Sequence, residues 1–362
     1  MKKKSVLVAP LNWGLGHATR CIPVINELLN QQADVIIASD GAALKLLRQI
    51  FPDLKSVEIQ GYNVKYQKGG SFAWAMLRQF PSLMESIRKE HTQLINYTDK
   101  HPVDAIISDN RFGLWHPTIP AVIMSHQLYT HLPGIWKILA PFLHFINHAK
   151  LRKFKEVWVP DTDTFQNLSG ELSHRKKTKL NTHFIGWLSQ FDNFVQSTES
   201  TGKYDLAVVL SGPEPQRTVL ESLLLPQLNL PGKKVILVRG LPSEYQKLNY
   251  AGIKIVNYMT TKELYQVMSH SETIVCRSGY TSLMDLAFLQ KKAILIPTPG
   301  QIEQEYLAEL CEDRGYCPTA AQGQFDLPEL LQKLPRYSGF PIPLNSHILQ
   351  QRISTLLYKA AR

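Results

Sequence analysis

Residues 275–310, VCRSGYTSLMDLAFLQKKAILIPTPGQIEQEYLAEL, contain two strand-to-helix transitions that decide the fold. In the first, an apolar run leads into Arg277-Ser278-Gly279 and then into a helical pattern. In the second, an apolar run ends at Pro297 and leads through a polar loop into another helical pattern. Short apolar strands that alternate with helices are typical of βαβ units with parallel strands. A helix entered through glycine presents free backbone N–H groups and a positive dipole end, so the stretch predicts a phosphate site at a strand end.

The same alternation runs along the chain and is interrupted once. A polar segment separates two series of apolar strands, and an amphipathic helical pattern at 346–362 ends the sequence. We therefore predict an α/β protein of two tandem Rossmann-like domains, each with a doubly wound parallel sheet, facing a cleft that holds the ligand. The predicted domains are 1–190 and 205–340, with a linker at 191–204 and a C-terminal helix at 341–362 that packs back on the first domain. The predicted strands are 5–11, 34–40, 104–110, 120–126, 156–160, 206–212, 234–240, 253–259, 273–279 and 292–300.

The composition is typical of a cytoplasmic globular protein. The chain has 362 residues, of which 44% are hydrophobic, enough for two domains with cores. Its four cysteines form no CxxC pair and no Cys/His cluster with zinc spacing, so we expect reduced thiols. The apolar run after the N-terminal lysines is too short for a signal peptide, and no stretch approaches the roughly 18–20 uncharged residues of a transmembrane helix.

The net charge of +10 is unevenly distributed. Residues 1–199 hold 23 basic and 16 acidic side chains, residues 200–336 hold 14 of each, and the remaining tail adds three basic ones. Basic surfaces attract nucleic acid or anionic membranes, but no nucleic-acid-binding motif is present, so no nucleic-acid partner is predicted. Two helical stretches, 71–89 and 134–155, mix large apolar residues with lysine and arginine. They indicate either peripheral contact with an anionic membrane or ordinary packing on the sheet.

The first strand leaves through a second glycine turn, in VLVAPLNWGLGHATRC. Gly14 and Gly16 precede a helical pattern, and His17 stands at its mouth. A histidine suits a proton-transfer role because its ordinary pKa lies near working pH. The turn also resembles part of a dinucleotide fingerprint, although Thr19 replaces the third glycine, and Asp40 stands where a ribose-binding acid would be. A nicotinamide oxidoreductase is therefore one alternative.

Polar residues follow two further strands of the first domain and should lie near the same sheet edge. Asp109 is a candidate base or polar anchor, and Arg111 is a candidate phosphate contact. His126 and Gln127 are candidates for lining an acceptor site. Each of these residues is equally consistent with an ordinary helix cap or loop position.

The stretch 275–310 supplies the candidates of the second domain. Gly279 allows a ligand to approach the backbone closely, and Asp285, one turn into the helix, is placed to accept hydrogen bonds from a ribose. Asp285 also fits a capping box with Ser282. Gln301 and Gln304, on the neighbouring loop and helix, are candidates for contacting the hydroxyls of a sugar.

These two units resemble the donor-binding domain of MurG-type N-acetylglucosaminyltransferases and their relatives, which have the GT-B fold. In that group the acid six residues after the glycine of R-S-G binds the ribose, and Asp285 occupies this position, where glutamate is usual. A histidine is common where this chain has Gln301, and the glutamine three residues later matches Gln304. The resemblance covers essentially the whole chain and is closer still to a bacterial branch of predicted glycosyltransferases that shares GLGHATR and a GPEPQR-like loop.

The resemblance implies roles for further residues. His17 matches the histidine that faces the donor and is considered a base or orienting group. The loop LSGPEPQR lies where such enzymes contact the donor phosphates, and the group uses helix termini and basic side chains in place of a metal. Asp161-Thr162-Asp163 imitates a metal motif of the other glycosyltransferase fold, but we predict no metal and no cofactor. The donor-binding candidates are Gly14, Gly16, Ser211, Gly212, Arg217, Arg277, Ser278, Gly279, Asp285, Gln301 and Gln304.

Taken together, the sequence predicts an inverting glycosyltransferase that moves a sugar from a nucleotide-diphosphate donor, expected to be a UDP-sugar, to a hydroxyl acceptor, including a lipid-linked one. His17 or Asp109 would take the acceptor proton. The expected location is the cytoplasm, with peripheral contact at the inner face of the cytoplasmic membrane. Besides the oxidoreductase, the alternatives are a nonhydrolysing nucleotide-sugar epimerase and a non-catalytic subunit that binds sugar nucleotides.

Overall fold

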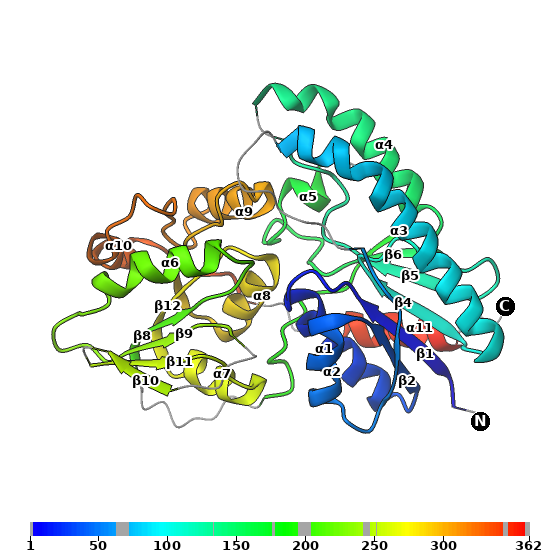
Figure 1. The fold of residues 1–362 in the computed structure, drawn as a ribbon, viewed down its shortest axis with the longest axis horizontal. Coiled ribbons are helices and arrows are strands. Elements are labelled where there is room, and N and C mark those ends of the chain that lie inside the picture. Colours follow the sequence, from blue (N-terminus) through cyan, green and yellow to red (C-terminus); the bar gives the residue numbers. More distant parts are fainter. Residues whose placement is uncertain are drawn as a thin grey trace. The chain divides into compact units, whose positions relative to one another are not determined.

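The computed structural model describes residues 3–62, 72–132, 134–175, 178–194, 204–241, 247–250, 252–342 and 347–358. The chain forms two compact units, which are Met1–Leu188 with Leu344–Arg362 and Ser189–Pro343 (Figure 1). The first unit contains residues 1–188 of the predicted N-terminal domain and the C-terminal helix, and the second contains the predicted donor domain together with Ser189 and Gln190, which were predicted to end the first domain. Of the predicted linker, residues 195–203 lie outside the described residues, while Phe191 is buried in the second unit against Tyr265.

The first unit is built on a seven-stranded parallel sheet in the order β3-β2-β1-β4-β5-β6-β7. The strands β1, β2, β4 and β5 are rich in Val, Ile and Ala and are buried on both faces, as expected for the centre of a parallel sheet covered by helices. They are β1 (Ser5–Pro10), β2 (Asp34–Ser39), β3 (Lys55–Glu58), β4 (Ala105–Asp109), β5 (Ala121–Met124), β6 (Glu156–Val159) and β7 (Thr182–Phe184).

Helices cover both faces of this sheet. Leu94 of α3 and Leu151 of α4 pack with Leu7, Ile106 and Ile123 in one core cluster, while α1 and α2 pack on the other side of β1 and β2. The helices are α1 (Gly16–Asn30), α2 (Gly41–Ile50), α3 (Phe72–Lys100), η1 (Gly134–Leu139), α4 (Ala140–Leu151), α5 (Glu171–His174) and α11 (Ile348–Tyr358).

The C-terminal helix α11 packs on α1. The Ser354 hydroxyl donates to Gln31 Oε1 at 2.9 Å, and Gln31 Nε2 donates to the Gln350 carbonyl at 2.9 Å. These bonds hold the C-terminal helix on the first unit, although residues 189–343, which precede it in the sequence, belong to the second unit.

The second unit has a six-stranded sheet in the order β10-β11-β9-β8-β12-β13, in which only β10 runs antiparallel. Its strands are β8 (Tyr204–Val209), β9 (Val235–Val238), β10 (Lys247–Tyr250), β11 (Ile253–Val256), β12 (Ser271–Cys276) and β13 (Lys292–Leu295). Its helices are α6 (Gln216–Leu224), η2 (Leu225–Gln227), α7 (Thr261–Ser269), α8 (Tyr280–Leu289), α9 (Ile302–Asp313), α10 (Leu327–Lys333) and η3 (Leu334–Arg336).

The prediction of two Rossmann-like parallel-sheet regions is confirmed, and each predicted strand overlaps an observed one. Three short strands were not predicted from the sequence: β3, β7 and β10, which have four, three and four residues. All three lie at sheet edges, where short strands need no long apolar run. Within the part of the chain that the structure describes, no helix is long and apolar enough to cross a membrane.

Candidate functional site

The turn between β1 and α1 places His17 at the start of a helix. Gly14 has a φ of +75°, a conformation that favours glycine, and α1 begins two residues later at Gly16. His17 is the second residue of α1, and its side chain is 13% exposed. The turn therefore holds an accessible imidazole at the carboxyl edge of the parallel sheet.

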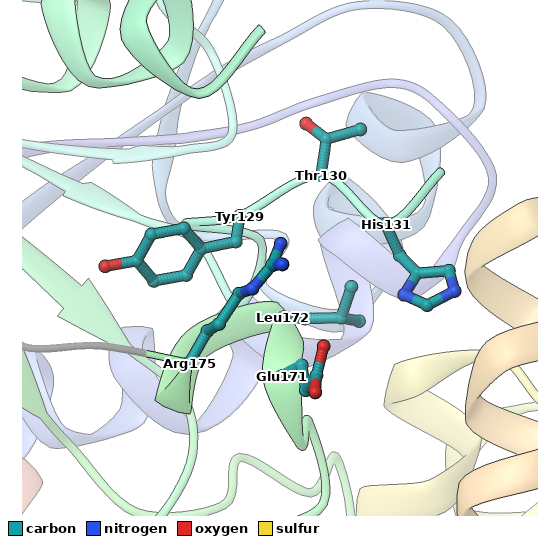
Figure 2. A pocket seen from close by; sticks show the side chains of 6 residues that line it. All are labelled: Tyr129, Thr130, His131, Glu171, Leu172 and Arg175. Atoms are coloured by element: carbon teal, nitrogen blue, oxygen red, sulfur yellow. The ribbon is translucent and has the colours of Figure 1, made fainter. Parts of the chain in front are cut away.

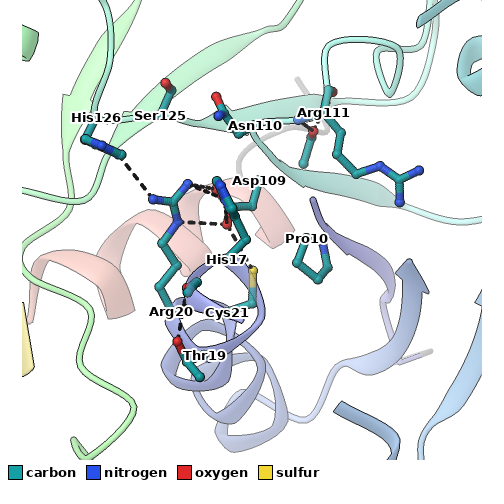
Figure 3. Close-up of polar contacts among 12 residues, drawn as sticks. Pro10, His17, Thr19, Arg20, Cys21, Asp109, Asn110, Arg111, Ser125 and His126 are labelled. Carbon is teal, nitrogen blue, oxygen red and sulfur yellow. Dashed lines mark hydrogen bonds and ion pairs between the residues drawn. The ribbon is translucent and has the colours of Figure 1, made fainter. Parts of the chain in front are cut away.

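Asp109 stands beside this turn because β4 pairs with β1. Pro10 and Asp109 are partners at the ends of these two strands, so the loops that follow β1 and β4 begin side by side at the same edge of the sheet. Asp109 Oδ2 lies 3.1 Å from His17 Nδ1, and the Asp109 side chain is completely buried (Figure 3). Both residues were predicted as candidate general bases, and of the two only the His17 side chain has exposed surface.

Two residues that the sequence analysis did not single out complete the cluster. Arg20, one turn after His17, forms a fork with Asp109, in which Nε donates to Oδ2 at 2.8 Å and Nη2 donates to Oδ1. Its Nη1 lies 3.2 Å from His126 Nδ1, and the Cys21 thiol lies 3.8 Å from Asp109 Oδ2. The only signal in the sequence was the spacing within GLGHATRC, which puts positions 17, 20 and 21 on one helix face.

Burial and charge set the protonation states in this cluster. Burial lowers the pKa of His17, and the Arg20 guanidinium lowers it further, while Asp109 acts in the opposite direction. Burial raises the pKa of Asp109, but Arg20 and His17 outweigh it and bring this pKa to about 2. Burial also raises the pKa of the Cys21 thiol well above its usual range. At neutral pH the cluster therefore holds a neutral imidazole, an anionic carboxylate and a neutral thiol.

Arg111 requires a correction. Figure 3 shows its side chain directed away from the cluster of His17, Arg20 and Asp109. The guanidinium is completely buried, paired with Glu90 at 2.6 Å and bonded to two backbone carbonyls. Arg111 has no exposed surface that could contact a phosphate of the acceptor. Its role is to hold Glu90 and the neighbouring backbone inside the first unit.

The remaining acceptor-side candidates follow β5. His126 is buried beside Arg20, as described above, so of this pair only Gln127 is partly exposed. The Gln127 backbone carbonyl accepts a hydrogen bond from Asn147 Nδ2 of α4 at 3.1 Å, and its N–H donates to Ser125 Oγ at 3.2 Å. The loop after β5 is therefore held by α4, and it brings His126 to the cluster.

A small hollow with a volume of about 10 Å³ lies farther along the same segment (Figure 2). Tyr129, Thr130, His131, Glu171, Leu172 and Arg175 line it. None of these residues was a sequence candidate, and the hollow is too small for a sugar nucleotide, since ligand pockets have volumes of roughly 300–1,000 Å³.

Asp161, the first acid of the metal-like motif, is a structural residue. Its carboxylate accepts hydrogen bonds from the backbone N–H groups of Thr162, Leu168 and Ser169, and from Trp187 Nε1 at 2.8 Å. By accepting these hydrogen bonds, the Asp161 carboxylate holds the loop that follows β6. Among the described residues, no group of three or more His, Cys, Asp or Glu side chains is arranged to hold a metal.

In the second unit, three glycine-containing loops follow the strands β8, β12 and β13. Gly212 has a φ of +104°, and the neighbouring Ser211 is exposed. Gly279 precedes α8 with an ordinary φ of −68°, and a Cβ added there would meet Ser282 Oγ no closer than 3.7 Å. Neither backbone conformation nor packing requires glycine at 279, so the open space beside it is available to a ligand.

Side chains predicted to bind the donor instead brace these loops. Arg277 donates to the carbonyls of Ile296, Pro297 and Gln216, and burial lowers its pKa to about 10. Ser278 Oγ donates to the Gln304 carbonyl at 2.7 Å, while Gln304 Oε1 accepts from the Thr298 N–H at 2.9 Å. These bonds fix the positions of the loops that carry the backbone groups.

Arg217 and Gln301 occupy the starts of two helices. The Arg217 guanidinium pairs with Glu214 at 2.6 Å and Glu221 at 2.7 Å, and these partners raise its pKa although burial opposes them. Gln301 caps α9 with partial exposure, and its N–H donates to the Thr298 carbonyl. Of these two candidates, Gln301 is the one with side-chain surface open to a ligand.

Asp285 faces into the second unit. It is 5% exposed, and its carboxylate accepts from Ser189 Oγ at 2.7 Å, Gln190 N at 3.3 Å and Gln190 Nε2 at 2.8 Å. Burial raises its pKa to about 6. A ribose would have to displace these donors, so contact between Asp285 and a nucleotide stays a prediction.

Comparisons with known proteins agree with this architecture. Residues 218–338 match the model of the glycosyltransferase family 28 C-terminal domain. The glycosyltransferase SnogD from Streptomyces nogalater is similar in structure, with 12% identity, a TM-score of 0.60 and coverage of 100% of this chain and 96% of that one. MurG from Acinetobacter baumannii matches with 14% identity, a TM-score of 0.55 and coverage of 99% and 96%. The spinosyn rhamnosyltransferase SpnG, solved with thymidine diphosphate, matches with 11% identity, a TM-score of 0.62 and coverage of 98% and 96%.

The chain has the GT-B fold. The predicted resemblance to GT-B glycosyltransferases is thereby confirmed, and the family 28 match supports sugar transfer as the general activity. No match was found among curated proteins. The GT-B fold gives no support to the oxidoreductase alternative, and the Asp40 carboxylate, which that alternative needed for a ribose, accepts from the Gly61 N–H at 3.0 Å.

Proposed function

We propose that this protein is an inverting glycosyltransferase that transfers a sugar from a UDP-sugar to a hydroxyl acceptor without a metal ion. The observation that carries the proposal is the His17–Asp109 pair at the mouth of α1. A proton on His17 Nδ1 satisfies the Asp109 carboxylate and leaves the Nε2 lone pair free to act as a base. The GT-B fold and the family 28 match supply the class of reaction.

The proposed chemistry is a single displacement. His17 Nε2 removes the proton from the acceptor hydroxyl while the acceptor oxygen attacks the anomeric carbon of the donor sugar. The bond between that carbon and the phosphate oxygen breaks, and the nucleoside diphosphate leaves with the electron pair. Attack on the face opposite the leaving group inverts the configuration. Asp109 stabilises the imidazolium that forms, which is its role as a positioning residue.

The leaving diphosphate would be stabilised by the glycine loops of the second unit. The N-terminus of α8, behind Gly279, and the loop at Ser211 and Gly212 would offer backbone N–H donors to the phosphates. Gln301 would contact the sugar. The structure of SpnG with thymidine diphosphate supports a nucleoside diphosphate as the ligand class.

Gly279→Ala is a sharp test of the donor site because the added methyl has space in the protein. The variant should unfold at the same temperature as the wild type without ligand but should lose most of the stabilisation by UDP. A bound ligand at about 100 times its Kd raises stability by about 2.7 kcal/mol, so the loss is measurable by thermal shift. Equal UDP shifts in both proteins would show that Gly279 does not contact UDP. A shift with dTDP but not UDP would show that the nucleobase of the donor is thymine.

His17→Ala tests the reaction itself. Loss of a general base lowers the rate by about 10²–10⁴-fold, and UDP binding should be unchanged because the second unit carries the donor loops. Transfer is measured as UDP release that depends on added acceptor, with EDTA present to test metal independence. Full activity in His17→Ala would refute the proposed base, and isomerised donor formed without acceptor would favour the epimerase.

We further propose that α4 and η1 bring the first unit to the cytoplasmic face of an anionic membrane, where a lipid-linked acceptor would lie. Ile138, Phe142 and Phe145 are 83%, 64% and 68% exposed, at a spacing that shares one helical face. Lys137 of η1 and Arg152, the residue that follows α4, are exposed beside them. Apolar side chains flanked by basic ones are typical of helices that lie on anionic membranes.

The membrane proposal is tested by sedimentation with vesicles. Phe142→Ser together with Phe145→Ser should weaken binding to phosphatidylglycerol-containing vesicles at least about tenfold, since burying each phenylalanine contributes roughly 1.5–3 kcal/mol. Phe165→Ser is the matched control, because Phe165 is 85% exposed but lies outside α4 and η1. Equal weakening by both variants, or no binding by the wild type, would contradict the proposal.

A further inference from the structure

Arg20 occupies an unusual position in the first unit. Its side chain is 2% exposed, and its guanidinium contacts Asp109, His17 and His126. The Asp109 carboxylate is shared, because Oδ2 accepts from Arg20 Nε at 2.8 Å and also lies 3.1 Å from His17 Nδ1. The histidine therefore pairs with a carboxylate whose charge a buried cation already compensates.

We propose that Arg20 is a positioning residue that sets the protonation and the orientation of His17 through the shared Asp109 carboxylate. The proposal deepens the proposed function and rests on it, since it assigns Arg20 a role for the base His17. Arg20 would not touch either substrate.

The hydrogen-bonding capacities of the three groups support this role. Arg20 has only donors and the Asp109 carboxylate has only acceptors, so His17 Nδ1, within 2.8 Å of Arg20 Nη2, can satisfy only one of them. The guanidinium has five N–H donors, so its fork on Asp109 leaves a second Nη2 proton that His17 Nδ1 could accept. A base needs the other form, in which His17 Nδ1 carries the proton and donates it to the Asp109 carboxylate. This arrangement leaves the lone pair on His17 Nε2, as a base requires.

Charge supports the same conclusion. A histidine beside an uncompensated carboxylate is held in its charged form, and such a neighbour moves a pKa by about 1–3 units. Here, protonation of His17 would place a second cation 2.8 Å from Arg20 Nη2. The ion pair of Arg20 with Asp109 is neutral overall, so His17 keeps its orientation without being driven to the charged form.

The titratable groups that face His17 come from three elements. Arg20 and Cys21 belong to α1, Asp109 ends β4, and His126 follows β5. Burial holds the Cys21 thiol in its neutral form. Arg20 Nη1 lies 3.2 Å from His126 Nδ1, so a hydrogen bond there requires that nitrogen to be unprotonated. Arg20 therefore contacts both histidines of the cluster.

The test is a histidine titration by NMR of the wild type, Arg20→Gln and Arg20→Lys, with the His17 signal assigned by its loss in His17→Asn. The wild-type His17 should titrate below 6.5, Arg20→Gln should raise its pKa by about one unit or more, and Arg20→Lys, which keeps the charge, should not. Arg48→Gln is the control for a lost positive charge, since Arg48 is exposed on α2 and bonds Ser56. It should leave the His17 pKa unchanged.

The outcomes separate Arg20's role from simple structural support. A folded Arg20→Gln with an unshifted His17 pKa would overturn the proposal, and so would a wild-type His17 that titrates above 7, even if Arg20→Gln fails to fold. With transfer activity in hand, the acid limb of kcat/KM should move to higher pH in Arg20→Gln by the same amount as the pKa. If the titration behaves as expected but no transfer is found with any acceptor, the proposed function fails while the effect of Arg20 on His17 stands.

Discussion

Replacement of Asp285 by asparagine should stabilise the second unit at neutral pH. The Asp285 carboxylate is buried, and its three donors, from Ser189 and Gln190, are all uncharged. An ionised carboxylate in such a place costs free energy because neutral donors replace only part of its hydration. Asparagine has nearly the same shape, and rotation of the Gln190 amide can present its oxygen to the new NH₂ group. The variant therefore keeps the hydrogen bonds and removes the charge.

The magnitude follows from the pKa of Asp285, which burial raises from 3.8 to about 6. Because the folded-state pKa is raised, the stability that protonated Asp285 contributes is complete below pH 3.8 and is lost as the pH rises through 6. The whole effect is about 3 kcal/mol at 1.36 kcal/mol per pKa unit, and about half of it falls between pH 5 and pH 8. Asp285→Asn should not lose this contribution, so its advantage over the wild type should grow across that range.

Hydrogen exchange on peptides from α8, measured at several pH values, is a suitable assay because it reports on the second unit directly. Tryptophan fluorescence supplies the internal reference, since all six tryptophans lie in residues 1–188, within the first unit. Asp161→Asn is the matched control, because more N–H and O–H donors converge on Asp161 than an amide oxygen can accept. That control should destabilise the first unit by about 1–3 kcal/mol. An Asp285→Asn protein that is less stable than the wild type at pH 8, or whose stability has the same pH dependence, would refute the reasoning.

The same variant decides the ribose assignment. If Asp285 binds a ribose, Asp285→Asn should lose much of the thermal shift by UDP, as the resemblance to MurG-type enzymes implies. If the carboxylate stays with Ser189 and Gln190, the shift by UDP should survive while the pH dependence changes. The thermal shift by UDP and the pH dependence of stability are independent measurements, so either result decides whether Asp285 binds a ribose or only stabilises the fold.

Three further predictions concern the first unit and the thiols. Asp109→Asn should lower transfer about 10²–10⁴-fold through the loss of His17 orientation, in protein shown by circular dichroism to be folded. Glu90→Gln should lower the free energy of unfolding, measured in urea, by about 3 kcal/mol, because it leaves the buried Arg111 guanidinium without its anion; an unchanged midpoint would contradict this. A thiol reagent should not modify native protein at pH 8, since all four cysteines, including Cys21, are buried, and rapid labelling would mean that a core opens readily.

The sequence was sufficient to predict the parallel sheets because their strands are buried on both faces. Such strands are near-continuous apolar runs, as in residues 34–40 and 292–300, and they stand out between helical patterns. The edge strands β3, β7 and β10 were missed for the opposite reason, since a strand with one neighbour can be short and polar.

The candidate site was only partly predictable. The glycine turn and His17 could be singled out because glycines before a helix mark a tight turn and a histidine there is a candidate for proton transfer, and Asp109 followed from its position at a strand end. Arg20 was overlooked because a helical arginine usually faces solvent, and its burial depends on a carboxylate 89 residues away. Arg111 was over-assigned, because its buried partner Glu90 lies on a different element and no local pattern indicates the pair.

The contrast between two buried arginines, Arg20 and Arg111, shows what distinguishes a functional site from a structural ion pair. Arg20 and Arg111 each pair with a buried carboxylate. In the Arg111 pair, Glu90 turns its second oxygen to the backbone N–H of Gly113, so every strong contact remains inside the protein. In the Arg20 pair, Asp109 turns an oxygen to His17, whose side chain reaches the surface. A buried ion pair that ends on an accessible titratable group can influence chemistry at the surface, whereas one that ends on the backbone can only stabilise the fold.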